Sequence, residues 1–368
     1  MRNLLHAICP YFAMFPETFV EEQLEQHSRE GDLVLDPFSG RGTTLLQSLL
    51  MNRNAVAIDI NPVAYCISAA KAHVPGKSHL LLRLSSLERS YSAGDPDPIR
   101  QERANLPPFF RRAFHYDTLA QLLFFREHLR WRESRVDCFL AAVILGILHG
   151  ESTRSRRYLS NQMPRTISTK PAYSLKWWKD RNLWPKKRDV FNRLREEVDF
   201  RLRSQVPSLH GRAVLGDARQ AAQRFPRLQG AVTAVITSPP YFDVTSSEED
   251  QWLRLWFLGY DPRPTYRRIS KDDRYEVKGQ YWRFLSEVWQ GIAPLIRKDG
   301  VLVCRLGGSG MAQTEITSGI TASLVSAFSS ADLISGPRES ELLRRQTPSF
   351  RPGTAGYRFE VDYVFRVG

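Results

Sequence analysis

The sequence predicts an α/β fold in which a parallel sheet is interrupted by a large helical insertion. Short apolar, β-branched runs bounded by turn residues alternate with longer stretches of helical periodicity, which is typical of a parallel sheet covered by helices. After the second apolar run this alternation stops for well over a hundred residues, although a crossover between parallel strands needs only about a dozen. We therefore expect an α/β core that carries an inserted helical subdomain.

The expected parallel strands of this core are apolar runs at residues 33–35, 55–58, 213–215, 234–236 and 301–304. The first two runs end at Asp36 and Asp59, and a helical pattern over residues 43–51 lies between them. A last pair of runs, around Leu333 and over residues 360–366, predicts an antiparallel hairpin at the edge of the sheet.

The insertion is expected between about residues 75 and 206. Its helical stretches lie at 119–129, 136–149 and 186–202, and Pro- and Ser-rich segments join them. The predicted organisation is therefore a first part of the core at 1–75, the insertion at 76–206 and a second part of the core at 207–368.

Composition narrows the class of protein. With 368 residues, 42% of them hydrophobic, the chain has ample material for a core. Its most apolar stretch, residues 138–148, is shorter than the roughly 20 residues that a membrane span needs, and the N-terminal residues lack the pattern of a secretory signal. The four cysteines form no CxxC pair, and no two histidines have HExxH spacing. We expect a cytoplasmic protein with buried thiols, no metal and no membrane association.

The charge points to a polyanionic partner. The formal net charge is +13, and residues 154–203 hold 15 basic and five acidic residues interleaved with five Tyr and Trp. Basic groups neutralise phosphates while aromatic rings stack on bases, although a solvated basic helix face with core aromatics would give a similar composition. The candidate nucleic-acid-binding residues are Arg154, Arg156, Arg157, Lys170, Lys176, Lys186 and Lys187.

A glycine-rich motif, DPFSGRGTT at residues 36–44, lies between the first expected strand and a helix. Glycines there let the backbone approach a ligand closely, and Asp59 at the end of the second strand can accept hydrogen bonds from ribose hydroxyls. A dinucleotide site would prefer glycine where Leu45 stands, and Asp36 would crowd a pyrophosphate. The cationic, phosphate-free S-adenosylmethionine suits this loop better.

A second motif, TSPPYF at residues 237–242, follows the apolar run at 234–236. Two prolines stiffen the backbone and offer no N–H, so the loop is rich in hydrogen-bond acceptors. It could orient an amino group toward a methyl donor while Tyr241 stacks on a base. The alternative interpretation is an ordinary Pro-Pro turn.

DPFSGRGTT and TSPPYF resemble motifs I and IV of the amino-directed DNA methyltransferases. Residues 11–17, 57–62 and 215–218 are similar to the segment before motif I, to motif II and to motif III. The resemblance covers residues 8–75 and 211–368 and implies a Rossmann-like, seven-stranded methyltransferase sheet. It implies that S-adenosylmethionine is bound by Phe15, Asp36, Phe38, Gly40, Gly42, Thr43, Asp59 and Asp217. The insertion precedes motif III rather than following motif IV, which leaves open whether residues 76–206 recognise the target.

The resemblance also implies a mechanism, carried by Ser238, Pro239, Pro240 and Tyr241. The base must leave the duplex because its amino group is otherwise buried in pairing. Tyr241 would stack on it, supported by Phe242, while the Ser238 hydroxyl and the Pro239 carbonyl bind the amino group. Direct displacement then follows, driven by positioning and electrostatics. The chain has no Pro-Cys dipeptide, which disfavours carbon-5 methylation.

Serine at position 238 favours N4 of cytosine, because in this family aspartate there usually accompanies adenine. Double-stranded DNA is the expected partner, and a cognate restriction or defence partner is left open. The alternatives are an N6-adenine methyltransferase, an RNA or small-molecule amino methyltransferase, an inactive DNA-binding protein and a nicotinamide-dependent dehydrogenase.

Overall fold

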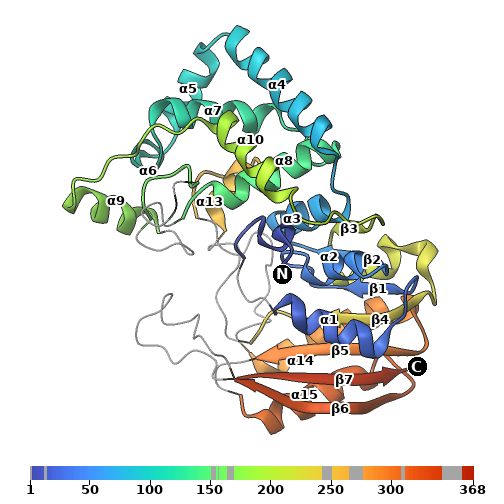
Figure 1. The fold of residues 1–368 in the computed structure, drawn as a ribbon. Helices are drawn as coiled ribbons and strands as arrows, with labels where there is room; N and C mark the ends of the chain where they lie inside the picture. Colours follow the sequence, from blue (N-terminus) through green and yellow to red (C-terminus); the bar gives the residue numbers. More distant parts are fainter. Residues whose placement is uncertain are drawn as a thin grey trace. The chain divides into compact units, whose positions relative to one another are not determined.

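The computed structural model describes residues 2–11, 15–150, 155, 157–163, 170–242, 251–264, 277–307, 311–341 and 359–368 (Figure 1). The chain divides into two compact units. One contains Met1–Pro10, Val74–Val206 and Ser246–Arg268, and the other contains Tyr11–His73, Pro207–Thr245 and Ile269–Gly368. Sequence patterns did not indicate that the first ten residues and a segment after the SPPY motif belong with the helical unit.

The second unit is built on a seven-stranded sheet of order β3-β2-β1-β4-β5-β7-β6. Its strands are β1 (Leu33–Asp36), β2 (Asn54–Asp59), β3 (Arg212–Leu215), β4 (Val232–Thr237), β5 (Ile296–Gly307), β6 (Ala331–Glu341) and β7 (Phe359–Val367). The first five are parallel, whereas β7 pairs antiparallel with both β5 and β6. The predicted Rossmann-like α/β sheet and its antiparallel edge hairpin are confirmed.

Helices cover both faces of this sheet. Alternate residues of a strand point to opposite faces, so neighbouring residues pack against different helices. On one face Leu35 belongs to a core cluster with side chains of α14 (Lys278–Ile292) and α15 (Gln313–Val325). On the other, Val34 packs with α1 (Glu17–His27), while α2 (Thr43–Leu50) packs on β2. The remaining elements are α3 (Pro62–Ala72), η2 (Ala218–Gln220), α11 (Ala221–Arg224), η3 (Pro226–Leu228) and η4 (Ala293–Leu295). Burial on both faces explains why the central strands read as continuous apolar runs.

Every regular secondary-structure element in the described residues of the first unit is a helix. It contains η1 (Leu4–Ala7), α4 (Lys77–Ala93), α5 (Asp97–Asn105), α6 (Pro108–Ala113), α7 (Tyr116–His128), α8 (Arg135–Ile147), α9 (Pro171–Asp180), α10 (Val190–Arg201) and α13 (Trp252–Phe257). The helix expected from residue 186 begins at Val190, because the Asp189 side chain accepts a hydrogen bond from the Asn192 N–H and caps it.

The core of this helical unit lies around α8. From Asp137 to Ile147 every residue of α8 is buried, as expected for a helix that is apolar on nearly all sides. Trp252 and Trp256 of α13 are also buried, against Phe109 and Phe110. No helix in the described part of the chain is long and apolar enough to cross a membrane.

Candidate active site

Polar residues follow the carboxyl ends of four neighbouring parallel strands in the second unit. Asp217 comes two residues after β3, Asp59 and Asp36 end β2 and β1, and Ser238 follows β4. The strand order places these ends along a single edge of the sheet. Between β1 and β4 the strand order reverses, and α/β sheets bind ligands outside such a point. The glycine-rich motif and the SPPY motif flank this point from its two sides.

The glycine-rich loop is held by backbone geometry that only glycine adopts easily. Gly40 and Gly42 have φ values of 49° and 70°, in the left-handed region. A Cβ on Gly42 would lie 2.9 Å from Oγ of Ser68 on α3. At this residue, both the backbone angle and the packing therefore exclude a side chain.

Asp59 joins this loop to the end of β2. Its Oδ2 accepts a hydrogen bond from the Gly40 N–H at 2.8 Å, and its Oδ1 accepts one from the Asn61 N–H at 2.9 Å. Burial raises the pKa of Asp59 to about 7, against the lowering effect of these two N–H groups. A carboxylate has about four acceptor positions, so this group has capacity for hydroxyl donors of a ligand.

Ile60 is an exposed apolar residue beside this acid, and the sequence motifs did not single it out. Its side chain is 39% exposed, directly after Asp59. Because Ile60 follows a buried strand and is partly exposed to solvent, its side chain offers an apolar surface to the ring of a ligand. The sequence did contain a signal for it, because an apolar residue stands between Asp59, which ends the strand, and Asn61-Pro62, where the next helix begins.

Asp36 links the ends of β1 and β4. It is 2% exposed, and its Oδ1 accepts hydrogen bonds from Thr237 Oγ1 at 2.8 Å and from the Phe38 N–H at 3.1 Å. Burial raises its pKa to about 6. Thr44 reinforces the link, since its hydroxyl donates to the Ile236 carbonyl at 3.1 Å. The two motifs are therefore joined through Thr237 and Thr44, whose roles sequence reasoning missed.

The other expected cofactor residues occupy varied positions. Phe15 is buried and packs against Phe19 in the α1 cluster, and Phe38 meets Phe284 edge-on at 5.9 Å. Thr43 is buried, and its hydroxyl accepts from Arg41 Nε. The remaining acid, Asp217, is held by the guanidinium of Arg219 at 2.7 Å. Contacts of these residues with a cofactor stay predictions.

The SPPY loop follows β4, and its tyrosine is buried. Ser238 is half-buried and its Oγ donates a hydrogen bond to the Tyr241 hydroxyl at 3.2 Å. That hydroxyl donates to Glu360 Oε1 at 3.0 Å. Tyr241 is 3% exposed, and a Cβ on Gly307 would lie 2.8 Å from its Cε2 atom. Stacking of this ring on a base stays a prediction, and it requires the ring to become accessible.

The rest of the loop is also packed. Pro239 is buried and Pro240 is half-buried. The next aromatic, Phe242, is 8% exposed and meets the Tyr281 ring edge-on at 5.9 Å. The predicted support of the stacked base by Phe242 stays a prediction.

The hydroxyl of Tyr241 contacts a charged cluster on β5 and β7. Arg305 donates to both oxygens of Asp362 at 2.6 and 2.8 Å, and one of its NH groups lies 3.5 Å from Glu360 Oε2. Its guanidinium also lies 3.9 Å from the centre of the Phe19 ring. Sequence reasoning missed this cluster, although acids two residues apart in a strand, as in Glu-Val-Asp at 360–362, share one face.

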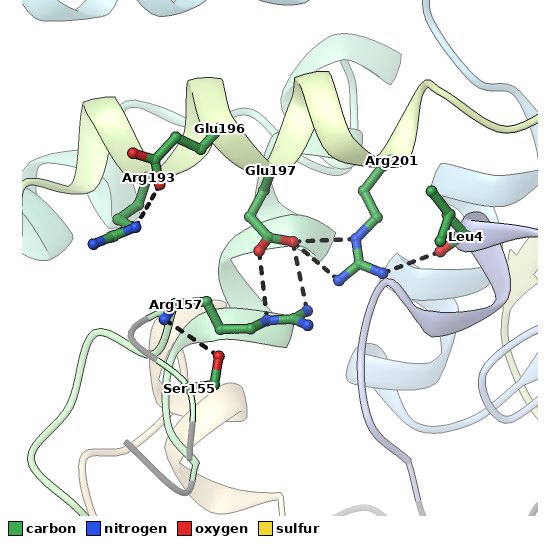
Figure 2. Close-up of polar contacts among 7 residues, drawn as sticks. All are labelled: Leu4, Ser155, Arg157, Arg193, Glu196, Glu197 and Arg201. Carbon is green, nitrogen blue, oxygen red and sulfur yellow. Dashed lines mark hydrogen bonds and ion pairs between the residues drawn. The ribbon is translucent and has the colours of Figure 1, made fainter. Parts of the chain in front are cut away.

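Several candidate nucleic-acid-binding cations pair with carboxylates of their own unit. Arg157 Nε lies 3.4 Å from Glu197 on α10, which also accepts from Arg201 at 3.0 Å, and Arg201 in turn donates to the Leu4 carbonyl at 3.1 Å (Figure 2). Lys176 pairs with Asp180 at 2.9 Å and Lys187 with Asp117 at 2.6 Å. By contrast, Lys170 and Lys186 are exposed and make no ion pair with another described residue. Arg154 and Arg156 lie outside the described residues.

The aromatic residues of this region divide between surface and core. Trp184 is 63% exposed and carries the Arg112 guanidinium 3.5 Å from its ring centre, and Tyr173 is 48% exposed. Trp178 is fully buried and packs against Phe109. Trp178 therefore fits the core interpretation, whereas contact of the exposed Trp184 and Tyr173 with nucleic acid stays a prediction. Within the described ranges no cluster of His, Cys, Asp or Glu suits a metal ion.

The chain is similar to proteins of one family. A family model described as DNA methylase matches residues 5–70. The type II methyltransferase M.MjaII of Methanocaldococcus jannaschii is 42% identical over 67 residues, which cover 18% of this chain and 13% of that protein. The type II methyltransferase M.BsoBI of Geobacillus stearothermophilus is 24% identical over 282 residues, 70% of this chain and 53% of that protein. The chain thus spans about half the length of these relatives or less.

Among solved structures, an rRNA methyltransferase, aviRa from Streptomyces viridochromogenes, aligns over 99% of this chain and 90% of its own, with 14% identity and a TM-score of 0.35. The fold assignment rests instead on the strand order β3-β2-β1-β4-β5-β7-β6 described above. The sequence matches support the resemblance to the amino-directed DNA methyltransferases that the motifs indicated.

Proposed function

We propose that this protein transfers a methyl group from S-adenosylmethionine to the exocyclic amino group of a base in double-stranded DNA, with N4 of cytosine as the favoured acceptor. One observation carries the proposal. The SPPY loop after β4 is joined to the glycine-rich loop after β1 by the hydrogen bond from Thr237 to Asp36. An acceptor-rich loop for an amino group therefore adjoins a loop suited to a nucleoside cofactor.

The residues at the edge of the sheet fit S-adenosylmethionine, which when bound supplies an electrophilic methyl group on a sulfonium. Asp59 keeps acceptor positions for ribose hydroxyls beyond its two N–H partners. Ile60 offers an exposed apolar side chain for the adenine ring. Gly40 and Gly42 add no side chain of their own to the loop, and no phosphate needs to be accommodated beside Asp36.

The SPPY residues would bind and orient the amino group of an extruded base. Pro239 has no N–H, so its carbonyl and the Ser238 hydroxyl present acceptors to the amino hydrogens. Holding both hydrogens fixes the direction of the nitrogen lone pair, and such positioning lowers the barrier without a covalent intermediate. Ser238 also supports cytosine, through the association of serine at this position with N4 methylation in the family.

The helical unit would supply contacts to the phosphate backbone, and residues 76–206 are our candidate for target recognition. Exposed Lys170 and Lys186, with Trp184 and its Arg112 partner, combine positive charge with an accessible ring. This is the chemistry of nucleic-acid surfaces that neutralise phosphates and stack on bases.

The test is to incubate the purified protein with labelled S-adenosylmethionine and mixed-sequence duplex DNA, digest the DNA and identify the methylated nucleoside by mass. We expect N4-methylcytosine, and no product from Tyr241→Ala. N6-methyladenine would retain the reaction but contradict the interpretation of Ser238. A transcript of the same sequence tests RNA in parallel, and product on the transcript alone would contradict DNA as substrate.

A further inference from the structure

Two hydroxyls and one carboxylate form a directed chain of hydrogen bonds from the SPPY loop into the sheet. Ser238 Oγ lies 3.2 Å from the Tyr241 hydroxyl, which lies 3.0 Å from Glu360 Oε1. An ionised carboxylate only accepts hydrogen bonds, so Tyr241 gives its single proton to Glu360 and accepts from Ser238. Ser238 Oγ is thereby left with its lone pairs for another donor.

We propose that Ser238, Tyr241 and Glu360 form a proton relay that removes the proton lost by the target amine, with Glu360 as the final acceptor. This inference rests on the proposed function. As the amine nitrogen bonds to the methyl carbon, the carbon–sulfur bond breaks and its electron pair stays on sulfur. An N–H proton passes to Ser238 Oγ, the Ser238 proton passes to Tyr241, and the Tyr241 proton passes to Glu360. The products are a neutral methylated amine and a protonated Glu360, which later releases its proton to water.

The surroundings of Glu360 suit a group that gains and loses a proton. Arg305 gives two short hydrogen bonds, 2.6 and 2.8 Å, to Asp362 and only one long one, 3.5 Å, to Glu360. Arg305 therefore stabilises the ionised form of Asp362 more than that of Glu360. Burial raises the pKa of Glu360 above its ordinary value, and the nearby Asp362 adds to this, although Arg305 and the Tyr241 hydroxyl oppose it. On β6 the facing charged residue is Arg338, opposite Asp362.

The hydroxyl of Tyr241 has no part in stacking, which needs only the ring. The ring is buried against the backbone at Gly307, and the hydroxyl makes the two bonds of the relay. Tyr241→Phe therefore separates the two roles, because it keeps the ring and removes the proton path. Glu360→Gln keeps the shape of the acceptor and removes its ability to take a proton.

The experiment measures single-turnover methyl transfer to duplex DNA from pH 5 to 8.5, at saturating protein and cofactor. In the wild type the rate should rise with pH as Glu360 becomes ionised. Tyr241→Phe and Glu360→Gln should each be about 100-fold slower at pH 8, within the range for lost acid–base catalysis, and should lose this rise. Their affinity for S-adenosylmethionine, measured by equilibrium binding, should equal that of the wild type. Asp362→Asn, which leaves the three relay residues in place, should keep a pH-dependent rise but shift it to lower pH, because Asp362 raises the pKa of Glu360.

The other possible results contradict either the relay or the proposed function. Wild-type rates in Tyr241→Phe and Glu360→Gln would overturn the relay alone. Slower transfer with the pH-dependent rise intact would also overturn it, since the residues would then only position the loop. If Glu360→Gln fails to fold, Tyr241→Phe, which leaves the ion pairs in place, decides between these results. A wild-type protein that binds cofactor but methylates no nucleic acid would overturn the proposed function, and the relay with it.

Discussion

Two regions were singled out from sequence by different kinds of signal: the strand ends at Asp36 and Asp59, here called the cofactor edge, and residues 154–203, here called the basic stretch. At the edge, short motifs named individual residues, and Asp59 and Asp36 do contact the loop that the motifs define. In the basic stretch a count of charges named the residues, and Arg157, Lys176 and Lys187 are paired with acids of their own unit. A motif specifies position relative to the backbone, whereas a charge count does not say which charges are already neutralised.

Part of the positive charge of the helical unit forms ion pairs that stabilise the unit. Glu197 and Arg201 are 8% and 1% exposed, and a buried charge is tolerated only when it is paired. Their cluster joins α10 to the Leu4 carbonyl of η1 (Figure 2). Such residues are unavailable to phosphate, so the exposed lysines are the better candidates for contact with DNA.

The largest effect expected from this comparison is on stability. Glu197→Ala leaves Arg201 buried without its carboxylate, which should lower the free energy of unfolding by about 3–5 kcal/mol. The neighbouring Glu196, which pairs with Arg193 at the surface of the same helix (Figure 2), is the matched control. Glu196→Ala should change stability by no more than about 0.5 kcal/mol. Equal effects of the two substitutions in chemical unfolding would show that burial of the ion pair does not determine the loss of unfolding free energy.

Asp36 gives a test of burial at the cofactor edge. Its pKa of about 6 in the folded chain exceeds the unfolded value of about 4, so the folded state favours the neutral acid. Its contribution to stability is therefore present below pH 4 and lost as the pH rises through 6, which amounts to about 3 kcal/mol. Asp36→Asn keeps an acceptor for Thr237 without the charge.

Between pH 4 and pH 8 the wild type should lose about 3 kcal/mol more unfolding free energy than Asp36→Asn. Chemical unfolding of both proteins at each pH measures this difference. Parallel pH profiles would mean that the carboxylate is ionised at little cost in the folded protein.

The sheet and the strand–turn–helix setting of the glycine-rich motif were predictable because their determinants are local. Apolar runs ending in Asp36 and Asp59, with glycines between them, constrain strand, turn and helix within about thirty residues. The Tyr241–Glu360 contact was not predictable, because it depends on how β7 inserts beside β5, where Arg305 faces Asp362. Strand pairing across such distances leaves no mark on either segment alone. The pairing of Arg157 with Glu197 was hidden because the two residues lie 40 positions apart in the chain and meet only when the helical unit folds.

Cofactor affinity should depend on pH through Asp59. Because its pKa is about 7 and ribose hydroxyls donate to the ionised form, affinity should rise about tenfold from pH 6 to pH 8. Asp59→Asn should remove this dependence and weaken binding about 10-fold to 100-fold at pH 8, the worth of a hydrogen bond to a charged group. Equilibrium binding of S-adenosylmethionine measures both. Asp32→Asn, just before β1 at the opposite end of that strand, is the control, and a matching loss there would contradict a specific role for Asp59.

The smallest expected effect separates exposed from paired lysines in DNA binding. A lysine that neutralises a phosphate releases counterions, so its loss reduces the slope of log affinity against log salt by about 1. Replacing Lys170 and Lys186 together with alanine should therefore reduce the slope by about 2. Replacing Lys176 and Lys187, which are paired with Asp180 and Asp117, should reduce it less, because each loss also frees an acid. Binding to duplex DNA across a salt series measures the slopes. Equal reductions would mean that DNA displaces the acids from their lysines, and charge count alone would then be the better guide to this surface.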